Sequence, residues 1–458
     1  IMLSAHTHRS YFLAGSLILL VLIALPTPLG AQVSRKAKPL VALAPIVDLN
    51  PKPATSWLPP SILWGLTYNF RKLSSIELLD QADMEKLLQA EELQPGQEVD
   101  DQRAVAIGRK LNADLMVAVA YEVIEDEKVS LSVRLIEPKS DKVNKPMTVE
   151  APIDRLLYSL ATIALRAASK MKYDVTSEEH RSVNNPLTFS FRSFYDYRRA
   201  LSAYDPEAGT GNLSEAMALL TNAVVRDPRF SEARFLLGLL AARQGRSEQA
   251  ATHLQQLVQD NPAHPNSQHN LGLARLNRGD YSVARGELLK AYQTHPRRAN
   301  ILNDLALAAY YLKDYESARS YLTNASELAP TSSVIWNNMG IMAYAQGAFT
   351  EGQQAYAKAV QHNPKSVTSH YNLGLTYLQL AEMEKAKEAF QKTLELDPRH
   401  AKTYYSLALI AEGDGTGKAA AYWKKYLELA EADPAEQPFV AFAQGELEKQ
   451  PSSKTPQP

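Results

Sequence analysis

Cysteine is absent from all 458 residues of this chain. Its absence excludes disulfide bonds, thiolate metal sites, thiol nucleophiles and a lipid-modified cysteine anchor. It suits an oxidising compartment of the cell envelope, although many cytoplasmic proteins also lack cysteine. The composition therefore permits export, and the argument for export has to come from other residues.

Charge of one sign is also lacking, because 49 basic residues nearly balance 50 acidic ones and the formal net charge is -1. No block of lysine and arginine supplies the positive patch that nucleic-acid binding requires. We therefore expect no nucleic-acid partner.

Catalytic and metal-binding motifs are missing as well. The ten histidines are scattered without metal-ligand spacing, and no G-x-S-x-G elbow or suitably spaced carboxylate pair occurs. The stretch Gly413–Lys418 looks like a phosphate loop, but Glu412 stands where glycine is needed and Ala419 where serine or threonine is needed. We predict an inter-helix turn there, and no enzyme activity, cofactor or metal.

One long uncharged apolar run is present, at Tyr11–Leu25, and a helix-breaking stretch at Pro26–Gln32 follows it. The run has the length of a signal-peptide core and is short for a membrane span of roughly 20 residues. We predict that residues 1–31 are a signal peptide cleaved after Ala31. An uncleaved anchor stays open because Leu29 is bulky for a cleavage site, and membrane contact would then involve residues 11–25 only. In both cases we expect an exported chain, periplasmic or membrane-tethered and facing the periplasm.

Residues 38–172 alternate between strand and helix patterns, which is typical of an α/β sandwich domain. Roughly 130 residues are enough to bury a core of their own. The expected strands are Leu40–Pro45, Ile76–Leu79, Leu115–Ile124, Val129–Ile136 and Pro146–Val149, and the expected helices carry Ile62 to Leu73, Met84 to Leu88, a third segment capped by Asp101, and Ile153–Met171.

The second half of the chain is marked by proline at a fixed interval of 34 residues. Proline ends a helix because it lacks a backbone donor and clashes with the preceding turn. The interval therefore predicts about seven helical hairpins over 189–434, after a linker at 173–188 and before a capping helix at 435–450 and a disordered tail at 451–458. The six prolines are Pro228, Pro262, Pro296, Pro330, Pro364 and Pro398.

Small residues recur with the same interval, each paired with a large residue further along its hairpin. A small side chain lets the two helices of a hairpin approach closely, and the large one fills the remaining space. The small positions are Gly238, Gly272, Ala306, Gly340 and Gly374.

These repeats resemble those of tetratricopeptide repeat proteins, which have this period. The resemblance covers roughly residues 190 to 434. The predicted fold class is thus a multidomain α+β protein, with an amino-terminal α/β sandwich domain followed by an all-α superhelix (an α-solenoid) whose concave face binds proteins.

The front half resembles the amino-terminal domain of TolB-like proteins. The residues that carry this likeness are Val41–Pro45, Ala106–Asp114 and Ser130–Ile136. Family members often have phenylalanine in the place of Ile46 and an aromatic residue within 142–149, and this chain has neither. The resemblance implies a non-enzymatic bacterial module that acts in envelope assemblies.

The candidate binding residues are those expected on the exposed side of the first helix of each hairpin. They are mostly aromatic or amide side chains, and tyrosine is favoured at binding surfaces. The alternative is that these side chains fill gaps between hairpins. A clamp for a terminal carboxylate is disfavoured because the paired lysines are missing. The candidates are Phe235, His269, Asn303, Tyr310, Tyr311, Asn337, Tyr344, Tyr371 and Tyr405.

Three functions follow from these features, in decreasing order of support. The first is a non-enzymatic scaffold of the bacterial cell envelope, whose groove holds an extended or helical protein segment and whose α/β domain docks to an envelope component. The second is a sensory or regulatory module whose α/β domain binds a small ligand. The third, a hydrolase or transferase, has only an unassigned α/β pocket in its favour.

Overall fold

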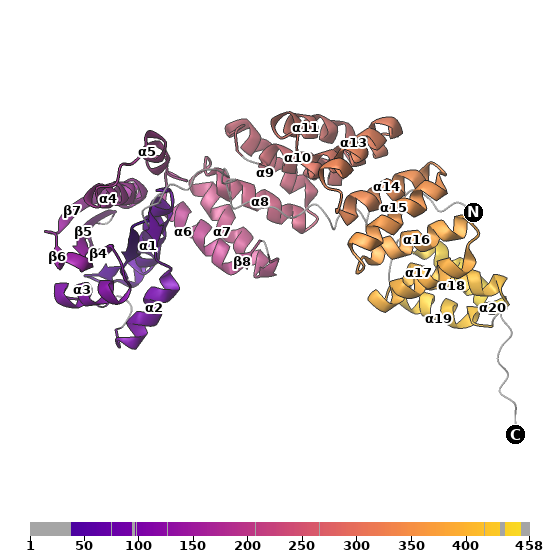
Figure 1. Ribbon diagram of the computed structural model, residues 1–458, viewed down its shortest axis with the longest axis horizontal. Coiled ribbons are helices and arrows are strands. Elements are labelled where there is room, and N and C mark those ends of the chain that lie inside the picture. The colour runs from indigo at the N-terminus through magenta and orange to yellow at the C-terminus, as the bar shows by residue number, and fades with distance from the viewer. Residues whose placement is uncertain are drawn as a thin grey trace, which may run out of the picture. The chain divides into compact units, whose positions relative to one another are not determined.

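The computed structural model describes residues 38–74, 76–93, 97, 99–125, 127–206, 208–264, 266–415, 417–430 and 436–449. The predicted signal peptide or anchor at 1–31 and the predicted tail at 451–458 lie outside these residues. The described chain divides into two compact units, which we call the amino-terminal unit (38–267) and the carboxy-terminal unit (268–449) (Figure 1).

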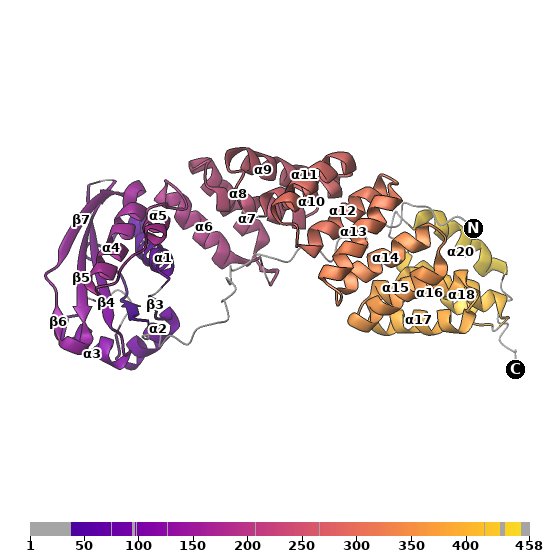
Figure 2. The same ribbon diagram turned by 45° about the horizontal axis from the view of Figure 1, so that its top comes forward.

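A mixed β-sheet forms the centre of the α/β domain in the amino-terminal unit (Figure 2). Among the described residues it has seven strands in the order β3-β1-β4-β5-β6, with β2 also on β4 and β7 also on β5. β1 runs parallel to β3 and β4, whereas β4, β5 and β7 are antiparallel. The strands are β1 (Leu40–Leu43), β2 (Val47–Asp48), β3 (Glu77–Leu78), β4 (Leu115–Glu125), β5 (Lys128–Glu137), β6 (Lys142–Val143) and β7 (Met147–Pro152).

Helices cover both faces of the sheet because the side chains of its central strand alternate. Val41 and Leu43 of β1 pack against α1 (Leu58–Arg71) and α4 (Leu156–Lys170). Ala42 points to the other face and packs against α2 (Gln81–Ala90) and α3 (Asp101–Lys110). The result is a doubly wound arrangement in which β1 lies between two connections that cover opposite faces.

The main strands and helices predicted for this domain are present, with differences at their ends. The cap of α3 is Asp100 instead of the predicted Asp101, because the Asp100 side chain accepts a hydrogen bond from the backbone N–H of Arg103. The two-residue strands β2 and β6 were not predicted, since two residues are too few to show alternation.

The segment predicted as a linker contains a helix that packs on the α/β domain. Thr176 and Glu179 form a capping box at the start of α5 (Ser177–Val183). Glu179 also accepts hydrogen bonds from the backbone N–H and the hydroxyl of Ser74, at 2.7 and 2.9 Å. Val183 is buried in the same core as α1 and α4. Residues 173–188 thus differ from the expected linker, because their few apolar side chains find a place in that core.

The first repeat helix, α6 (Phe191–Ala203), shares the core of the α/β domain. Phe191 and Phe194 are fully buried there, with ring centroids 5.9 Å from Trp57 and 6.4 Å from Tyr68. The guanidinium of Arg198 lies over the ring of Trp64 at 5.2 Å. Aromatic and cation–π contacts of this kind add to the free energy gained by burial.

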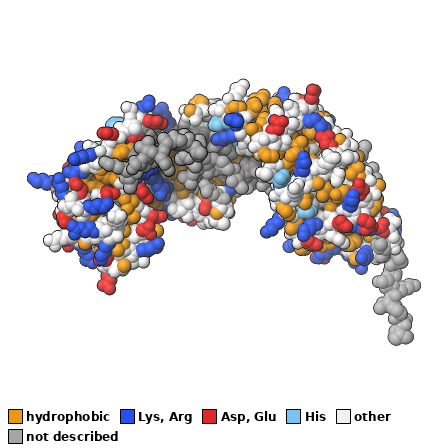
Figure 3. Space-filling model, viewed as in Figure 1, with side chains coloured by type: hydrophobic (Ala, Val, Ile, Leu, Met, Phe, Trp, Pro, Cys, Tyr) orange, Lys and Arg blue, Asp and Glu red, His pale blue; other side chains and the backbone are white. Residues whose placement is uncertain are grey.

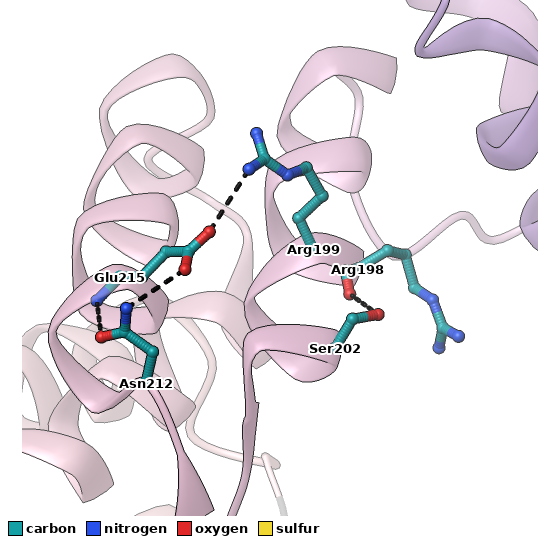
Figure 4. Close-up of polar contacts among 5 residues, drawn as sticks. All are labelled: Arg198, Arg199, Ser202, Asn212 and Glu215. Atoms are coloured by element: carbon teal, nitrogen blue, oxygen red, sulfur yellow. Dashed lines mark hydrogen bonds and ion pairs between the residues drawn. The ribbon is translucent and has the colours of Figure 1, made fainter.

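The opposite side of α6 pairs with α7 (Leu213–Arg226) to form the first hairpin. Arg199 donates to Glu215 at 3.4 Å, and Asn212 both caps α7 and contacts Glu215 (Figure 4). Arg198 points away from this polar contact (Figure 4). A two-stranded pair, β8 (Tyr204–Asp205) with β9 (Thr210–Gly211), lies in the connection and accounts for the irregular length of this hairpin.

The remaining described helices follow the predicted order of hairpins. The amino-terminal unit adds one more hairpin, and the carboxy-terminal unit has five and a final helix among its described residues. They are α8 (Ser231–Arg243), α9 (Ser247–Asp260), α10 (Ser267–Arg278), α11 (Tyr281–Thr294), α12 (Ala299–Tyr311), α13 (Tyr315–Leu328), α14 (Ser333–Ala345), α15 (Phe349–His362), α16 (Val367–Gln379), α17 (Met383–Leu396), α18 (Ala401–Gly413), α19 (Ala419–Ala430) and α20 (Gln437–Lys449).

The turn inside each hairpin repeats one backbone conformation every 34 residues. Its last residue before the second helix is left-handed, a conformation that glycine adopts at least cost. Four of the six positions are glycine, and the other two are lysine and alanine. They are Gly245, Gly279, Lys313, Gly347, Ala381 and Gly415, with φ between 59° and 92°.

The predicted pairing of small and large residues is confirmed. A Cβ atom added at Gly340 would lie 2.6 Å from the ring of Tyr356, and one at Gly374 would lie 2.5 Å from the ring of Phe390. Glycine at these positions is therefore required by the close approach of the two helices in each hairpin.

Candidate partner-binding surface and cavity

Five of the nine predicted binding residues are buried, so their expected exposure is wrong. They are Phe235, His269, Asn303, Asn337 and Tyr371, each at most 9% exposed. Phe235 packs on His264 with 4.8 Å between ring centroids, and Tyr371 packs between Phe390 and His400. These two side chains fill gaps, which is the alternative that the sequence left open.

The buried polar candidates of the carboxy-terminal unit form a ladder between successive first helices. His269 Nε2 lies 2.7 Å from Asp304 Oδ2, and Asn338 donates to Asn303 at 2.7 Å. Asn372 donates to Asn337 at 3.3 Å. Each contact joins residues 35 apart, so one repeat specifies the position of the next by hydrogen bonds between buried groups. We call His269, Asn303, Asp304, Asn337, Asn338 and Asn372 the polar ladder.

Two half-exposed candidates, Tyr310 and Tyr344, occupy the same position on α12 and α14. They lie near the hydroxyl of the buried Tyr356, whose pKa is raised well above its usual value by burial first and then by Tyr344 and Tyr310. Tyr377 of α16 packs on the same group. We call Tyr310, Tyr344, Tyr356 and Tyr377 the tyrosine cluster. Burial also raises the pKa of Tyr310 and of Tyr344, so all three hydroxyls stay protonated near neutral pH and can donate a hydrogen bond.

The last two candidates are also half-exposed. Tyr311 stacks on Tyr281 with 4.4 Å between ring centroids. Tyr405 lies among the aromatic rings of α19 and α20, next to the exposed Phe442 and one turn before the exposed Leu409. The sequence reasoning missed Leu409, Phe442 and Tyr377. The 34-residue register could have indicated Tyr377, which is one residue short of the position after Tyr344.

The α/β domain carries an open cavity of about 1090 Å³ at one edge of its sheet. The loop that follows β1 forms one wall, and α2, which follows β3, forms the other. The connections after β1 and β3 leave the sheet in opposite directions here, which is where doubly wound domains bind ligands. We call it the switch-point cavity. The sequence reasoning noted an α/β pocket without assigning any residue to it.

Within the part of the chain that the structure describes, no group of three or more histidine, aspartate and glutamate side chains is arranged to hold a metal ion. Gly415 and Gly417 both have positive φ and lie between α18 and α19, as the predicted inter-helix turn requires.

Comparison with protein families identifies the repeats. Family models described as tetratricopeptide repeat match residues 207–267, 269–333 and 367–400. The helical region of this chain is built of tetratricopeptide repeats. Arrays of this kind act as scaffolds for contact with other proteins.

Solved tetratricopeptide structures also align with the chain, without adding to the argument because every TM-score is below 0.5. A crystal structure of MamA shares 26% identity over 35% of this chain and 95% of its own, with a TM-score of 0.33. The Pseudomonas aeruginosa protein pilF shares 21% identity over 46% and 97%, with a TM-score of 0.40. A tetratricopeptide repeat protein from Parabacteroides merdae shares 15% identity over 54% and 99%, with a TM-score of 0.45.

No curated protein sequence matches the chain. Among the helices that the structure describes, none combines the length and the apolar character that a membrane span requires.

Proposed function

We propose that this chain is a non-enzymatic scaffold that holds a segment of a partner protein on its carboxy-terminal repeats. The observation that carries this proposal is the pair Tyr310 and Tyr344, half-exposed at equivalent positions of successive first helices. Tyrosine offers a large contact area and a hydrogen-bonding hydroxyl at a small entropy cost.

The surroundings of this pair favour an apolar segment with hydrogen-bonding groups. The hydroxyl groups gather around Tyr356, and the apolar side chains of Ile341 and Leu373 lie beneath. The only cation that we find over these rings is Lys385, whose Nζ lies 5.6 Å from the ring centre of Tyr377, among the described residues. An extended or helical segment that brings carbonyl groups and apolar side chains is the partner that this surface suits.

The place of action that we propose is the bacterial cell envelope. The uncharged run at Tyr11–Leu25 and the absence of cysteine support export, to the periplasm or to a membrane-tethered position facing it. The likeness of residues 38–172 to TolB-like domains supports docking of the α/β domain to an envelope component. Both basic and acidic side chains are scattered over this domain, so such docking would depend on shape more than on net charge (Figure 3).

The partner surface is tested by photo-crosslinking in cells. A crosslinking amino acid replaces Tyr344, and a matched control replaces Val283, which is 49% exposed on a second helix of the same unit. A protein adduct at Tyr344 that is missing at Val283 is expected. Equal adducts at both positions, or none at Tyr344, contradict the proposed surface.

The location is tested separately by cell fractionation together with sequencing of the mature amino terminus. We expect an envelope fraction and either a new terminus after Ala31 or an intact leader in the membrane. An intact leader in a cytoplasmic protein would overturn the envelope assignment.

The second candidate function, a sensory module with the α/β domain as its sensor, is favoured by the switch-point cavity. A thermal shift produced by an envelope metabolite and lost when the cavity is filled would support it.

A further inference from the structure

The switch-point cavity has an apolar floor. Ile46, Met84, Leu88 and Leu93 are buried beneath it, and the half-buried Leu63 of α1 lines one side. A narrow extension of about 40 Å³ continues from the same floor towards β4, where Met116, Ala118 and Ala120 line it. An apolar chain that enters this space removes its surface and that of the floor from water.

Proline builds the wall opposite α2. Because proline has a fixed φ and no side-chain rotamers to lose, this wall is already in its bound form before a ligand arrives. The residues are Pro45, Pro51, Pro53, Pro59 and Pro60.

The rim carries more negative than positive charge. Asp48, Glu85 and Glu92 line the cavity, against the single cation Lys52. Glu85 and Glu92 are exposed on the side of α2 and the turn that follows it, whereas Asp48 accepts hydrogen bonds from Tyr121 and from the backbone N–H of Asn50. A ligand whose apolar part lies on the floor therefore meets carboxylates with its polar end.

We propose that the switch-point cavity binds a small amphiphilic cation, an organic amine that carries an apolar chain. The floor and the narrow extension take the chain, and Glu85 and Glu92 attract the ammonium group. This inference gives the sensory candidate above a site and a ligand class, and it is independent of the tyrosine cluster.

The test uses three probes with the same chain and different polar ends: octylammonium, octan-1-ol and octanoate. Their binding to the full chain is measured by isothermal titration calorimetry at low salt and below micelle formation. We expect octylammonium to bind most tightly, octan-1-ol next and octanoate least. Equal affinity for the three probes, tighter binding of octanoate, or no binding at all would overturn the proposal.

Two variants separate the roles of rim and floor. The double variant Glu85→Gln with Glu92→Gln should weaken octylammonium about five- to tenfold and leave octan-1-ol unchanged, in line with the modest strength of exposed ion pairs. The control Asp83→Asn changes the charge of the same helix at a residue outside the cavity lining and should alter neither probe. An equal loss with Asp83→Asn would show a general charge effect and overturn the role of the rim.

Filling the cavity tests its location. Leu63→Trp adds a large ring at the half-buried wall and should abolish the binding of octylammonium while the thermal unfolding transition stays in place. Binding that survives in this folded variant places the amine elsewhere and overturns the site. Crosslinking at Tyr344 should be unchanged, so that failure of this inference and failure of the scaffold proposal are distinguishable.

Discussion

The α/β domain and the carboxy-terminal repeats are held together by contacts of very different sequence separation. In the α/β domain the backbone N–H of Leu40 donates to Asp114, 74 residues away, and such contacts close before the sheet exists. In the repeats, Asn338 reaches only as far as Asn303 in the preceding hairpin. Distant contacts produce a domain that unfolds as one piece, whereas neighbour contacts allow local loss of structure. The helix α6 is a repeat helix by sequence that belongs to the first kind by packing.

The largest effect is expected from Phe194→Ala in α6. Phe194 is 1% exposed within the core of the α/β domain, so the variant should lose about 3–5 kcal/mol of unfolding free energy. Hydrogen exchange should rise throughout β4 and β5 as well as in α6, which mass spectrometry of peptides can measure.

The matched control is Phe390→Ala, which removes an equally buried ring in the carboxy-terminal unit. Its exchange increase should stay within α16 to α18. Unchanged protection of β4 and β5 in Phe194→Ala would break the comparison between the two kinds of contact.

The next effect is a pH dependence that arises from His400. Burial lowers the pKa of His400 to about 4 from the ordinary 6.5, and its Nδ1 lies 2.7 Å from the hydroxyl of Thr403. Between pH 6.5 and about 4 the unfolded chain binds a proton that the folded chain excludes, so stability falls as the pH falls through this window. The loss approaches about 3 kcal/mol at the lower end and does not grow below it.

Urea unfolding at pH 7 and pH 4.5 checks this value by the difference between the parent chain and His400→Asn. The exposed His362 of α15 provides the control His362→Asn, which should leave the pH dependence as it was. An identical pH dependence in the parent chain and His400→Asn would contradict the assignment.

A smaller effect is expected at the glycines inside the hairpins. In Gly374→Ala the new Cβ would overlap the ring of Phe390, which should cost about 1–3 kcal/mol. Gly286→Ala is the control, because that exposed helical glycine has nothing within 4 Å of an added Cβ and should gain up to about 1 kcal/mol. Chemical denaturation of both variants decides; destabilisation of equal size at the two positions would refute the packing argument.

The smallest effect concerns the two left-handed residues that are not glycine. Lys313→Gly and Ala381→Gly should each stabilise the chain by roughly 0.5 kcal/mol, because glycine relieves the left-handed conformation but costs more entropy on folding. Gly347→Ala tests the same conformation in reverse and should destabilise by about 1 kcal/mol. Thermal unfolding measures all three, and a loss of stability in both glycine variants would contradict the expectation.

The repeats could be predicted from the sequence because their information is local. Proline and small residues at an interval of 34 fix where each helix ends and which faces meet, and the structure has both features. The β4–β5 hairpin was predictable for the same reason, since Val129, Leu131 and Val133 alternate with polar residues along one strand.

The remaining features depend on contacts that no local pattern reveals. Asn303 and Asn337 look like groove residues along their own helices, and only the neighbouring hairpin shows that their amide groups are buried in the polar ladder. The polar helix α5 and the side of α6 that Phe191 occupies are placed by the α/β core. The cavity likewise arises where the connections after β1 and β3 diverge, and strand order is not written in any one segment.

The sharing of α6 has an evolutionary consequence. A gene rearrangement that removed everything before residue 189 would leave the rings of Phe191 and Phe194 bare to water and prone to aggregation. Gain or loss of a 34-residue hairpin near Pro330 or Pro364 would leave that helix untouched. Lineages of this protein should therefore differ in the number of their later hairpins while inheriting the first one together with the sheet.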